Sequence, residues 1–170
     1  MDVAEAIRLK RAVRSFADEP LSPDDVQAIL SAGRRAQSSK NTQPWRFVAV
    51  QDRSTLKTLA GLGTYAGHLA GAALGVVIVT SDPAQRWSIL FDAGQAAAYM
   101  QLAAWERGIG SCLATLYEPE AARALLAIPP EFHVHVALSF GRPQDRSVMT
   151  SAPRPGGRQP AGSLVHWERW

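Results

Sequence analysis

The chain is poor in cysteine, because Cys112 is the only one among 170 residues. A lone cysteine excludes an intramolecular disulfide framework and favours a reducing compartment, so we expect a cytoplasmic protein. The sequence does not begin with a basic leader and an apolar stretch, so we expect no secretory signal. Long apolar runs are also missing. The two longest, around 69–80 and 96–104, are too short or too interrupted to span a bilayer, and we expect no membrane partner.

Neither positive nor negative charge is in large excess. The net charge is +3, without the clustered basic stripe of a nucleic-acid binder, so we expect no nucleic-acid partner. A hydrophobic fraction of 46% with 19% charged residues is typical of a globular protein and excludes disordered and fibrous classes. The length predicts a single domain over residues 1–170. Residues 141–170 are rich in proline, glycine and arginine, and we expect them to form an extended C-terminal arm.

Hydrophobic periodicity predicts a mixture of helices and strands. Residues 45–50 alternate as a strand does, and the β-branched run at 74–80 is typical of a strand buried on both faces. Residues 88–107 lack proline and are rich in alanine, which predicts a buried helix about 30 Å long. Further strands are predicted over 112–116 and 134–140, and further helices after Asp2, after Ser22, over 55–62 and over 118–126. This mixture predicts a three-layer α/β or α+β sandwich.

A polar loop before Pro44 is the most informative segment. The hydroxyl and amide groups of Ser38, Ser39 and Asn41 are suited to wrap a polar heterocycle with hydrogen bonds. Pro44 fixes its own φ and pushes Gln43 away from helical geometry, so the exit from the loop is stiff. The alternative is a turn whose polar groups bond only to its own backbone.

Four cations are candidates for binding phosphate. Lys10, Arg11 and Arg14 precede the polar loop, and Arg158 follows late in the chain. The planar guanidinium matches phosphate oxygens, although a helix end also attracts cations without any ligand. Arg158 has its own alternative as an ordinary loop charge, with Arg154 nearby as a competitor for the same role. The loop and the cations together predict a site for a phosphorylated heterocycle.

These two segments resemble the signature of the nitroreductase family of flavin enzymes. Residues 10–16, Lys-Arg-Ala-Val-Arg-Ser-Phe, are similar to the family's Arg-Arg-Ser-x-Arg-x-Phe box, and residues 37–45 are similar to its Pro-Ser-x-x-Asn-x-Gln-Pro-Trp box. The similarity continues through 108–112 and the ending at 158–170. The resemblance implies an α+β fold, a nitroreductase-like three-layer α/β/α sandwich with a central, mostly antiparallel sheet and a long core helix.

The resemblance also implies FMN as the cofactor and a homodimer with two flavins at its interface. The loop with Ser38, Ser39 and Asn41 would reach the flavin of the partner subunit. A backbone amide at Ala114 and Thr115 would face flavin N5, where a donor stabilises the negative charge of reduced flavin. The flavin phosphate and pyrimidine edge would be held by Lys10, Arg11, Ala12, Arg14 and Arg158.

Three positions depart from the family pattern. Ala12 replaces a serine and removes one hydroxyl contact, while Gln37 replaces a proline and loosens the entry to the loop. Thr115 stands where glycine is common, which narrows the pocket or shifts the backbone. His133 and His135 have strand spacing but no third ligand, so we expect no metal, and we interpret Cys112 as a buried thiol.

The implied activity is hydride transfer from NADH or NADPH through flavin N5 to a small electron-poor acceptor such as a nitroaromatic or quinone. No side-chain acid or base is evident, so the chemistry is assigned to the flavin and no catalytic side chain is predicted. A flavin-binding or flavin-sequestering protein without NAD(P)H turnover is the alternative, motivated by the short chain and Thr115. Flavin-fragmenting or dehalogenating chemistry, found among relatives, is a third possibility.

Overall fold

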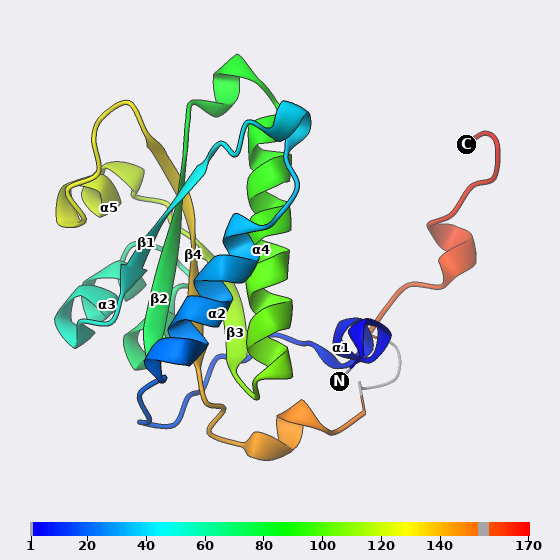
Figure 1. Ribbon diagram of the computed structural model, residues 1–170, viewed down its shortest axis with the longest axis horizontal. Helices are drawn as coiled ribbons and strands as arrows, with labels where there is room; N and C mark the ends of the chain where they lie inside the picture. Colours follow the sequence, from blue (N-terminus) through cyan, green and yellow to red (C-terminus); the bar gives the residue numbers. More distant parts are fainter. Residues whose placement is uncertain (1, 153–156) are drawn as a thin grey trace.

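The structure is a computed structural model that describes residues 2–152 and 157–170 (Figure 1). Helices α1, α2 and α3 each begin after a residue whose side chain accepts a backbone N–H from the first turn, namely Asp2, Ser22 and Asp52. The helices and strands in chain order are α1 (Val3–Leu9), α2 (Pro23–Arg34), β1 (Trp45–Val50), α3 (Arg53–Ala60), β2 (Leu74–Thr80), α4 (Ser88–Glu106), β3 (Gly110–Thr115), α5 (Pro119–Leu125) and β4 (His133–Gly141). The 3₁₀ turns are η1 (Ser39–Asn41), η2 (Gly67–Gly71), η3 (Pro83–Gln85), η4 (Arg146–Met149) and η5 (Ala161–Ser163).

The strands form one antiparallel sheet in the order β1-β2-β4-β3. Every residue of β2 is buried, as its continuous β-branched sequence predicts for a strand covered on both faces. Beyond β3, Ala12 forms a parallel bridge with Ser111, and the backbone N of Val13 donates to the Ser111 carbonyl at 2.9 Å. The chain around Ala12 therefore covers part of the outer edge of β3.

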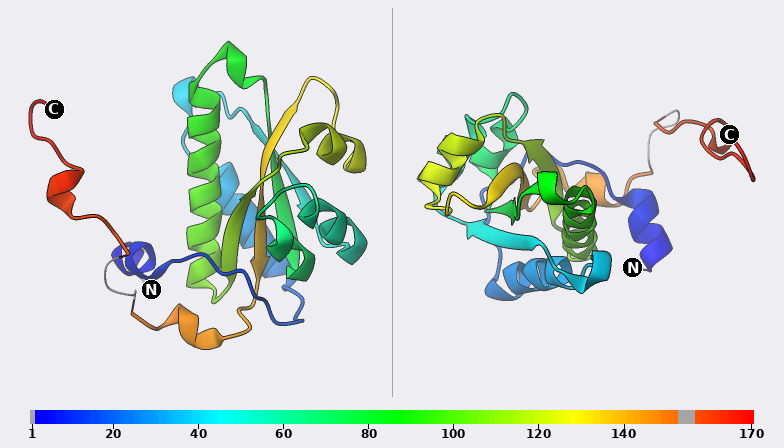
Figure 2. Two further views of the ribbon diagram at one scale, coloured as in Figure 1. Left: turned by 180° about the vertical axis from the view of Figure 1, so that it is seen from behind. Right: turned by 90° about the horizontal axis from the view of Figure 1, so that it is seen from above.

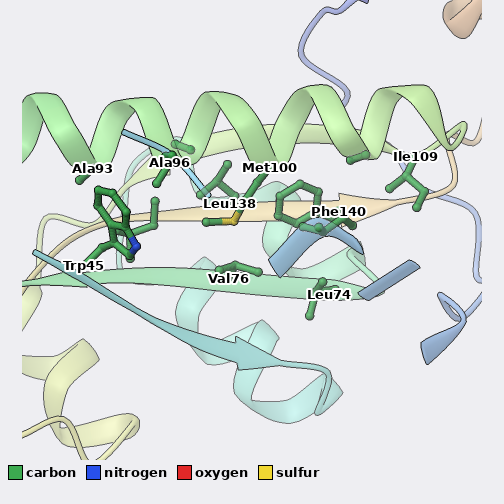
Figure 3. Close-up of a cluster of buried hydrophobic side chains, with 14 of the residues drawn as sticks. Trp45, Leu74, Val76, Ala93, Ala96, Met100, Ile109, Leu138 and Phe140 are labelled. Carbon is green, nitrogen blue, oxygen red and sulfur yellow. The ribbon is translucent and has the colours of Figure 1, made fainter. Parts of the chain in front are cut away.

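Helices α2 and α4 cover one face of the sheet, while α3, η2 and α5 cover the other (Figures 1 and 2). Figure 3 shows the face of the sheet that α4 covers, where Trp45, Met100 and Phe140 pack between α4 and the strands. Gly33 lets α2 approach α4 closely, because a Cβ at this position would lie 2.5 Å from Cε of Met100. The three-layer α/β/α arrangement with a long core helix confirms the predicted fold class.

Most predicted elements have the predicted type, with small shifts at their ends. Strands β1 and β2 match the predicted ranges to the residue. Strand β3 begins at Gly110, earlier than predicted, because α4 ends at a left-handed Gly108 with φ of 71° and the chain enters the sheet directly. Helix α3 begins at Arg53, earlier than predicted, because Asp52 caps it.

The C-terminal segment extends away from the rest of the molecule (Figures 1 and 2). Every residue over 157–170 is exposed, including Trp167 at 83% and Trp170 at 101%. The start of the predicted arm is different, because Gly141 is the last residue of β4 and pairs with Gly110. The description of the chain as one domain with an arm stays a prediction.

Asp25 on α2 joins three separate parts of the fold. Its carboxylate accepts from Nε of Arg107 at 2.7 Å and from the guanidinium of Arg142 at 2.9 Å, and only 5% of Asp25 is exposed. Burial acts to raise the pKa of Asp25, but hydrogen bonds from Arg107 and Ser22 and the charges of both arginines outweigh burial and lower the pKa. The ionised carboxylate therefore ties α2 to the end of α4 and the end of β4.

Replacing Asp25 with Asn is expected to lower the free energy of unfolding near neutral pH by roughly 2–3 kcal/mol. This loss is smaller than the loss that follows when one partner of a fully buried ion pair is removed, because the guanidinium groups of Arg107 and Arg142 keep some contact with water. Because the pKa of Asp25 is lowered by folding, its contribution is fully present above the ordinary pKa of 3.8 and is lost as the pH falls below it. Urea unfolding of both proteins at neutral and acidic pH tests this. A difference in stability that does not shrink with acidification contradicts it.

Candidate functional site

Lys10 lies in a cluster of positive charge beside α4. It follows α1 directly, and its Nζ donates to Oε1 of Gln101 at 2.9 Å. Burial lowers the pKa of Lys10, an effect that Cys112 opposes and the positive charge of Arg158 reinforces. The charge of Arg158 therefore acts on Lys10, whereas Arg154 lies outside the described residues.

Arg14 extends this cluster toward β3. Burial raises the pKa of the Cys112 thiol, and the nearby charges of Arg14 and Lys10 act against this rise. Among the described residues, Lys10, Arg14 and Arg158 form no ion pair with a carboxylate. Like charges gathered without a counter-ion create a local positive potential that favours an anionic ligand.

Arg11 and Ala12 take different places from these cations. Arg11 donates from Nε to the Leu9 carbonyl at 3.3 Å and from its guanidinium to the Ser151 carbonyl, so it contacts the chain that leads into the arm. Ala12 pairs through its backbone with Ser111 and offers no side-chain hydrogen bond. Their roles in binding a phosphate stay predictions.

The end of β3 presents one of the two predicted backbone amides at its outer edge. Leu116 donates its N–H toward β4, to the His135 carbonyl at 2.9 Å, whereas the Ser111 carbonyl points outward to Val13. Because successive residues of a strand face opposite sides, the N–H of Thr115 points outward and that of Ala114 points toward β4. Ala114 is buried and Thr115 is exposed, so the available donor belongs to Thr115.

Gly63 holds the chain close to this part of β3. A Cβ at Gly63 would lie only 2.2 Å from the carbonyl oxygen of Thr115, so no larger residue fits without moving the backbone. The adjacent Leu62 carbonyl accepts from the N–H of Tyr117 at 2.8 Å. The loop after α3 therefore fixes the position of the Thr115 peptide.

The polar loop has an unusual backbone and binds largely to itself. Lys40, Asn41 and Gln43 have φ values of 52°, 53° and 47°, in the left-handed region that disfavours residues with a side chain. Oγ of Ser38 accepts from the N–H of Gln43 at 2.9 Å, and Oδ1 of Asn41 accepts from the Gln43 side chain at 3.3 Å. The loop thus has internal hydrogen bonds of the kind expected if it were only a self-bonded turn. The assignment of Ser38, Ser39 and Asn41 to flavin binding stays a prediction.

The loop and the cation cluster lie at different levels along α4 (Figure 1). The loop contacts Asp92, since Ser39 donates its backbone N–H to that carboxylate at 3.1 Å, while Lys10 contacts Gln101. Gln101 follows Asp92 by nine positions in α4, which is about 14 Å along the helix axis. Lys10 and Arg14 thus act on Cys112 of β3, while the loop lies apart from them within one chain.

His68 is a candidate that sequence reasoning missed. Its Nδ1 is 2.7 Å from Oγ of Ser139, and only 8% of the residue is exposed. Its Nε2 and Oγ of Ser111 are buried without a hydrogen-bond partner among the described residues. Burial and, to a lesser extent, the charge of Arg14 lower the pKa of His68. In the sequence, the only signal is a polar side chain inside the small-residue segment 67–73.

A cavity with a volume of 390 Å³ lies between α2 and β1, where Leu30, Arg34, Trp45 and Arg46 contribute to its lining. Gln43 of the polar loop also lines it, but none of the predicted site residues does. No helix of the described residues is long and apolar enough to cross a membrane. Within residues 2–152 and 157–170, no three side chains of the metal-binding types gather in one place. The cation cluster beside β3 therefore remains the main candidate site.

Known proteins resemble the chain in both sequence and structure. A sequence model of the nitroreductase family matches residues 7–66 and 62–142. A protein of Archaeoglobus fulgidus, provisionally named NADH dehydrogenase/NAD(P)H nitroreductase, is 33% identical over 148 residues, which cover 82% of this chain and 84% of the relative.

Solved structures share the fold. An FMN-dependent nitroreductase from Clostridium difficile R20291 is 25% identical, with a TM-score of 0.87 over 99% of this chain and 100% of the other. The NADPH:FMN oxidoreductase of Vibrio harveyi, solved with NAD⁺, is 23% identical, with a TM-score of 0.86 over 98% of this chain and 77% of the other. The chain therefore belongs to the nitroreductase family and is an oxidoreductase of that family.

Proposed function

We propose that the protein is an FMN-dependent oxidoreductase that passes hydride from NADH or NADPH to a small electron-poor acceptor such as a nitroaromatic or quinone. The observation that carries this proposal is a group of cations, Lys10, Arg14 and Arg158, that form no ion pair among the described residues. Two of them, Lys10 and Arg14, act on Cys112 of the edge strand β3, which carries the outward-facing amide of Thr115. Bound FMN supplies the hydride transfer itself, because the family's cofactor carries that chemistry.

The described residues fit such a cofactor in chemical terms. Arg14, Lys10 and Arg158 would hold its phosphate, since charge-assisted hydrogen bonds to phosphate are among the strong ones in proteins. His68 offers a buried Nε2, which has no hydrogen-bond partner in the described part of the chain, for a polar atom of the ligand. Thr115 would direct its backbone N–H toward the ring system. Protein groups therefore bind and orient, and none is assigned a proton-transfer role.

A homodimer with shared sites accounts for the separation of the loop from the cations. In such a dimer, Ser39 and Asn41 of one chain would complete the site of the other chain. Exposed aromatic side chains on and next to α4 support this arrangement, namely Trp87 at 80%, Phe91 at 66% and Tyr99 at 41% exposure. Large apolar groups in such a patch commonly mark an interface. We keep the cytoplasm as the proposed compartment, since Cys112 has no second cysteine with which to pair.

The purified protein is expected to carry FMN and not FAD. The reason is that we propose one set of phosphate-binding cations, and the sequence has no dinucleotide-binding fingerprint. Mass spectrometry of the released cofactor, after a visible spectrum of the protein, identifies the flavin. Recovery of FAD, or of no flavin even after reconstitution, removes the basis of the proposal.

The second candidate is a flavin-binding protein without NAD(P)H turnover. It is favoured by Thr115, whose exposed side chain stands next to the outward-facing amide where the family commonly has glycine. Steady-state oxidation of NADH and NADPH with a nitroaromatic or quinone separates the candidates. Turnover only in a Thr115→Gly variant supports the second candidate, and turnover in the unmodified protein supports the enzyme.

A further inference from the structure

The loop of residues 38–43 has a conformation that its own sequence disfavours. Lys40, Asn41 and Gln43 are left-handed although none of them is glycine. Such a backbone persists only where surrounding groups hold it in place. Bonds inside the loop, such as the one from Gln43 N–H to Ser38 Oγ, do not connect it to the rest of the fold.

Asp92 supplies that connection from α4. Both of its carboxylate oxygens accept from the backbone N–H of Ser39, at 3.1 and 3.2 Å. Asp92 is only 3% exposed, and no other carboxylate of α4 is buried. A buried carboxylate needs partners with positive charge or N–H groups, so Asp92 and the loop depend on each other.

Arg86 adds a second connection from the segment before α4. Its guanidinium donates to Oγ1 of Thr42 at 2.6 Å and to the Ser39 carbonyl at 3.5 Å. It also lies 3.9 Å from the Asp92 carboxylate. The two charged side chains thus contact both the N–H and the C=O of Ser39, at the start of the left-handed segment.

We propose that Asp92 and Arg86 are positioning residues that hold the 38–43 loop in its left-handed conformation and so present Ser39 and Asn41 to the flavin. This inference rests on the proposed function and adds residues to it. Neither side chain needs to contact the ligand, because their bonds go to the loop. The same helix holds Lys10 through Gln101, so α4 positions both halves of the proposed site.

The test compares Asp92→Asn and Asp92→Ala with the unmodified protein. Asn keeps one oxygen to accept from Ser39 but loses the charge near Arg86, and Ala removes both contacts. We expect FMN to dissociate about tenfold faster from the Asn variant and faster still from the Ala variant, because the loop is no longer preorganised. The visible circular dichroism of bound flavin is expected to change as well, since it reports the surroundings of the ring.

Asp52→Ala is the matched control. Asp52 also accepts a backbone N–H, from Thr55 at 2.7 Å, but it caps α3 on the opposite face of the sheet. This control loses stability through a lost cap while the loop keeps its contacts. Equal changes in flavin dissociation and circular dichroism in Asp52→Ala and in the Asp92 variants overturn the proposal.

A measurement without the cofactor separates this inference from the proposed function. In the apo-protein, hydrogen exchange at the Ser39 amide is expected to be at least about tenfold faster in Asp92→Ala, since the amide loses its acceptor. If the Asp92 variants do not fold, the same hydrogen exchange is measured on Thr42→Val, which removes one contact of Arg86 with the loop and is expected to speed exchange at Ser39. Unchanged exchange overturns the positioning role, whereas altered exchange in a protein that never binds FMN overturns the proposed function.

Discussion

An Arg14→Ala variant is expected to bind FMN about 10- to 100-fold more weakly than the unmodified protein while keeping its fold. One charge-assisted hydrogen bond to phosphate is worth roughly 1.5–3 kcal/mol, which corresponds to this loss of affinity. Arg14 is exposed and forms no ion pair with the described residues, so its removal leaves the core unchanged. Flavin titration of the apo-variant measures the affinity, and thermal unfolding checks the fold.

Arg14→Lys is the matched control for charge. Lysine keeps the positive charge but not the planar donor arrangement, so an intermediate affinity is expected. Unchanged affinity in Arg14→Ala would show that the phosphate lies elsewhere.

Mixing two variants with weakened flavin binding tests the shared site directly. At an FMN concentration just above the dissociation constant of the unmodified protein, we expect Arg14→Ala and Asn41→Ala homodimers to hold little flavin, because every site carries one defect. If the loop serves the partner's site, one site of a mixed dimer combines the Arg14→Ala cations with the Asn41→Ala loop. The other site then combines two unmodified parts. Co-expression with two affinity tags isolates the mixed dimer, and about half of the normal flavin content is expected in it. If each chain instead builds its own site, the mixed dimer recovers no flavin.

Deleting the residues after Pro160 is expected to separate the dimer and empty the flavin sites together. The removed segment contains four exposed large hydrophobic residues, Leu164, Val165, Trp167 and Trp170. Tryptophan is prominent among the residues that dominate interfaces, at about 2 kcal/mol or more each, so two of them change the dimer dissociation constant by roughly a thousandfold. Light scattering and flavin absorbance on the same sample measure both effects, which a shared site links.

A full-length variant with Trp167→Ser and Trp170→Ser serves as the control for deletion of the backbone. It is expected to show the same direction of change, because the large rings provide most of the contact area. A fully flavin-loaded monomer of the truncated protein would contradict the shared-site arrangement.

Features that depend on neighbouring residues could be predicted from the sequence. Ser22 followed by Pro23 is enough to start α2, and the β-branched run of β2 is enough to form a buried strand. The cations and the polar loop were likewise visible as motifs. Their roles were supplied by family resemblance, because residue types alone do not specify a ligand.

Features that depend on distant residues could not be predicted. Nothing near Ser39 in the sequence indicates Asp92, which reaches it only because α4 packs below the loop. His68 and Ser139 likewise meet only because η2 packs against β4. Arg11 belongs to the predicted basic box, yet its contact with Ser151 depends on how the chain leaves β4. Tertiary packing, and not local preference, decides these contacts.

The order of strands in the sheet has a consequence for biosynthesis. β2 lies at the centre, but one of its two neighbours, β4, begins only at His133, after α4, β3 and α5 have been made. Until then, the buried strand can pair only with β1, and its other edge is an open template for pairing with foreign chains. Nascent chains that stop before Gly141 therefore expose an aggregation-prone strand, and the yield of folded protein depends on how soon β4 leaves the ribosome.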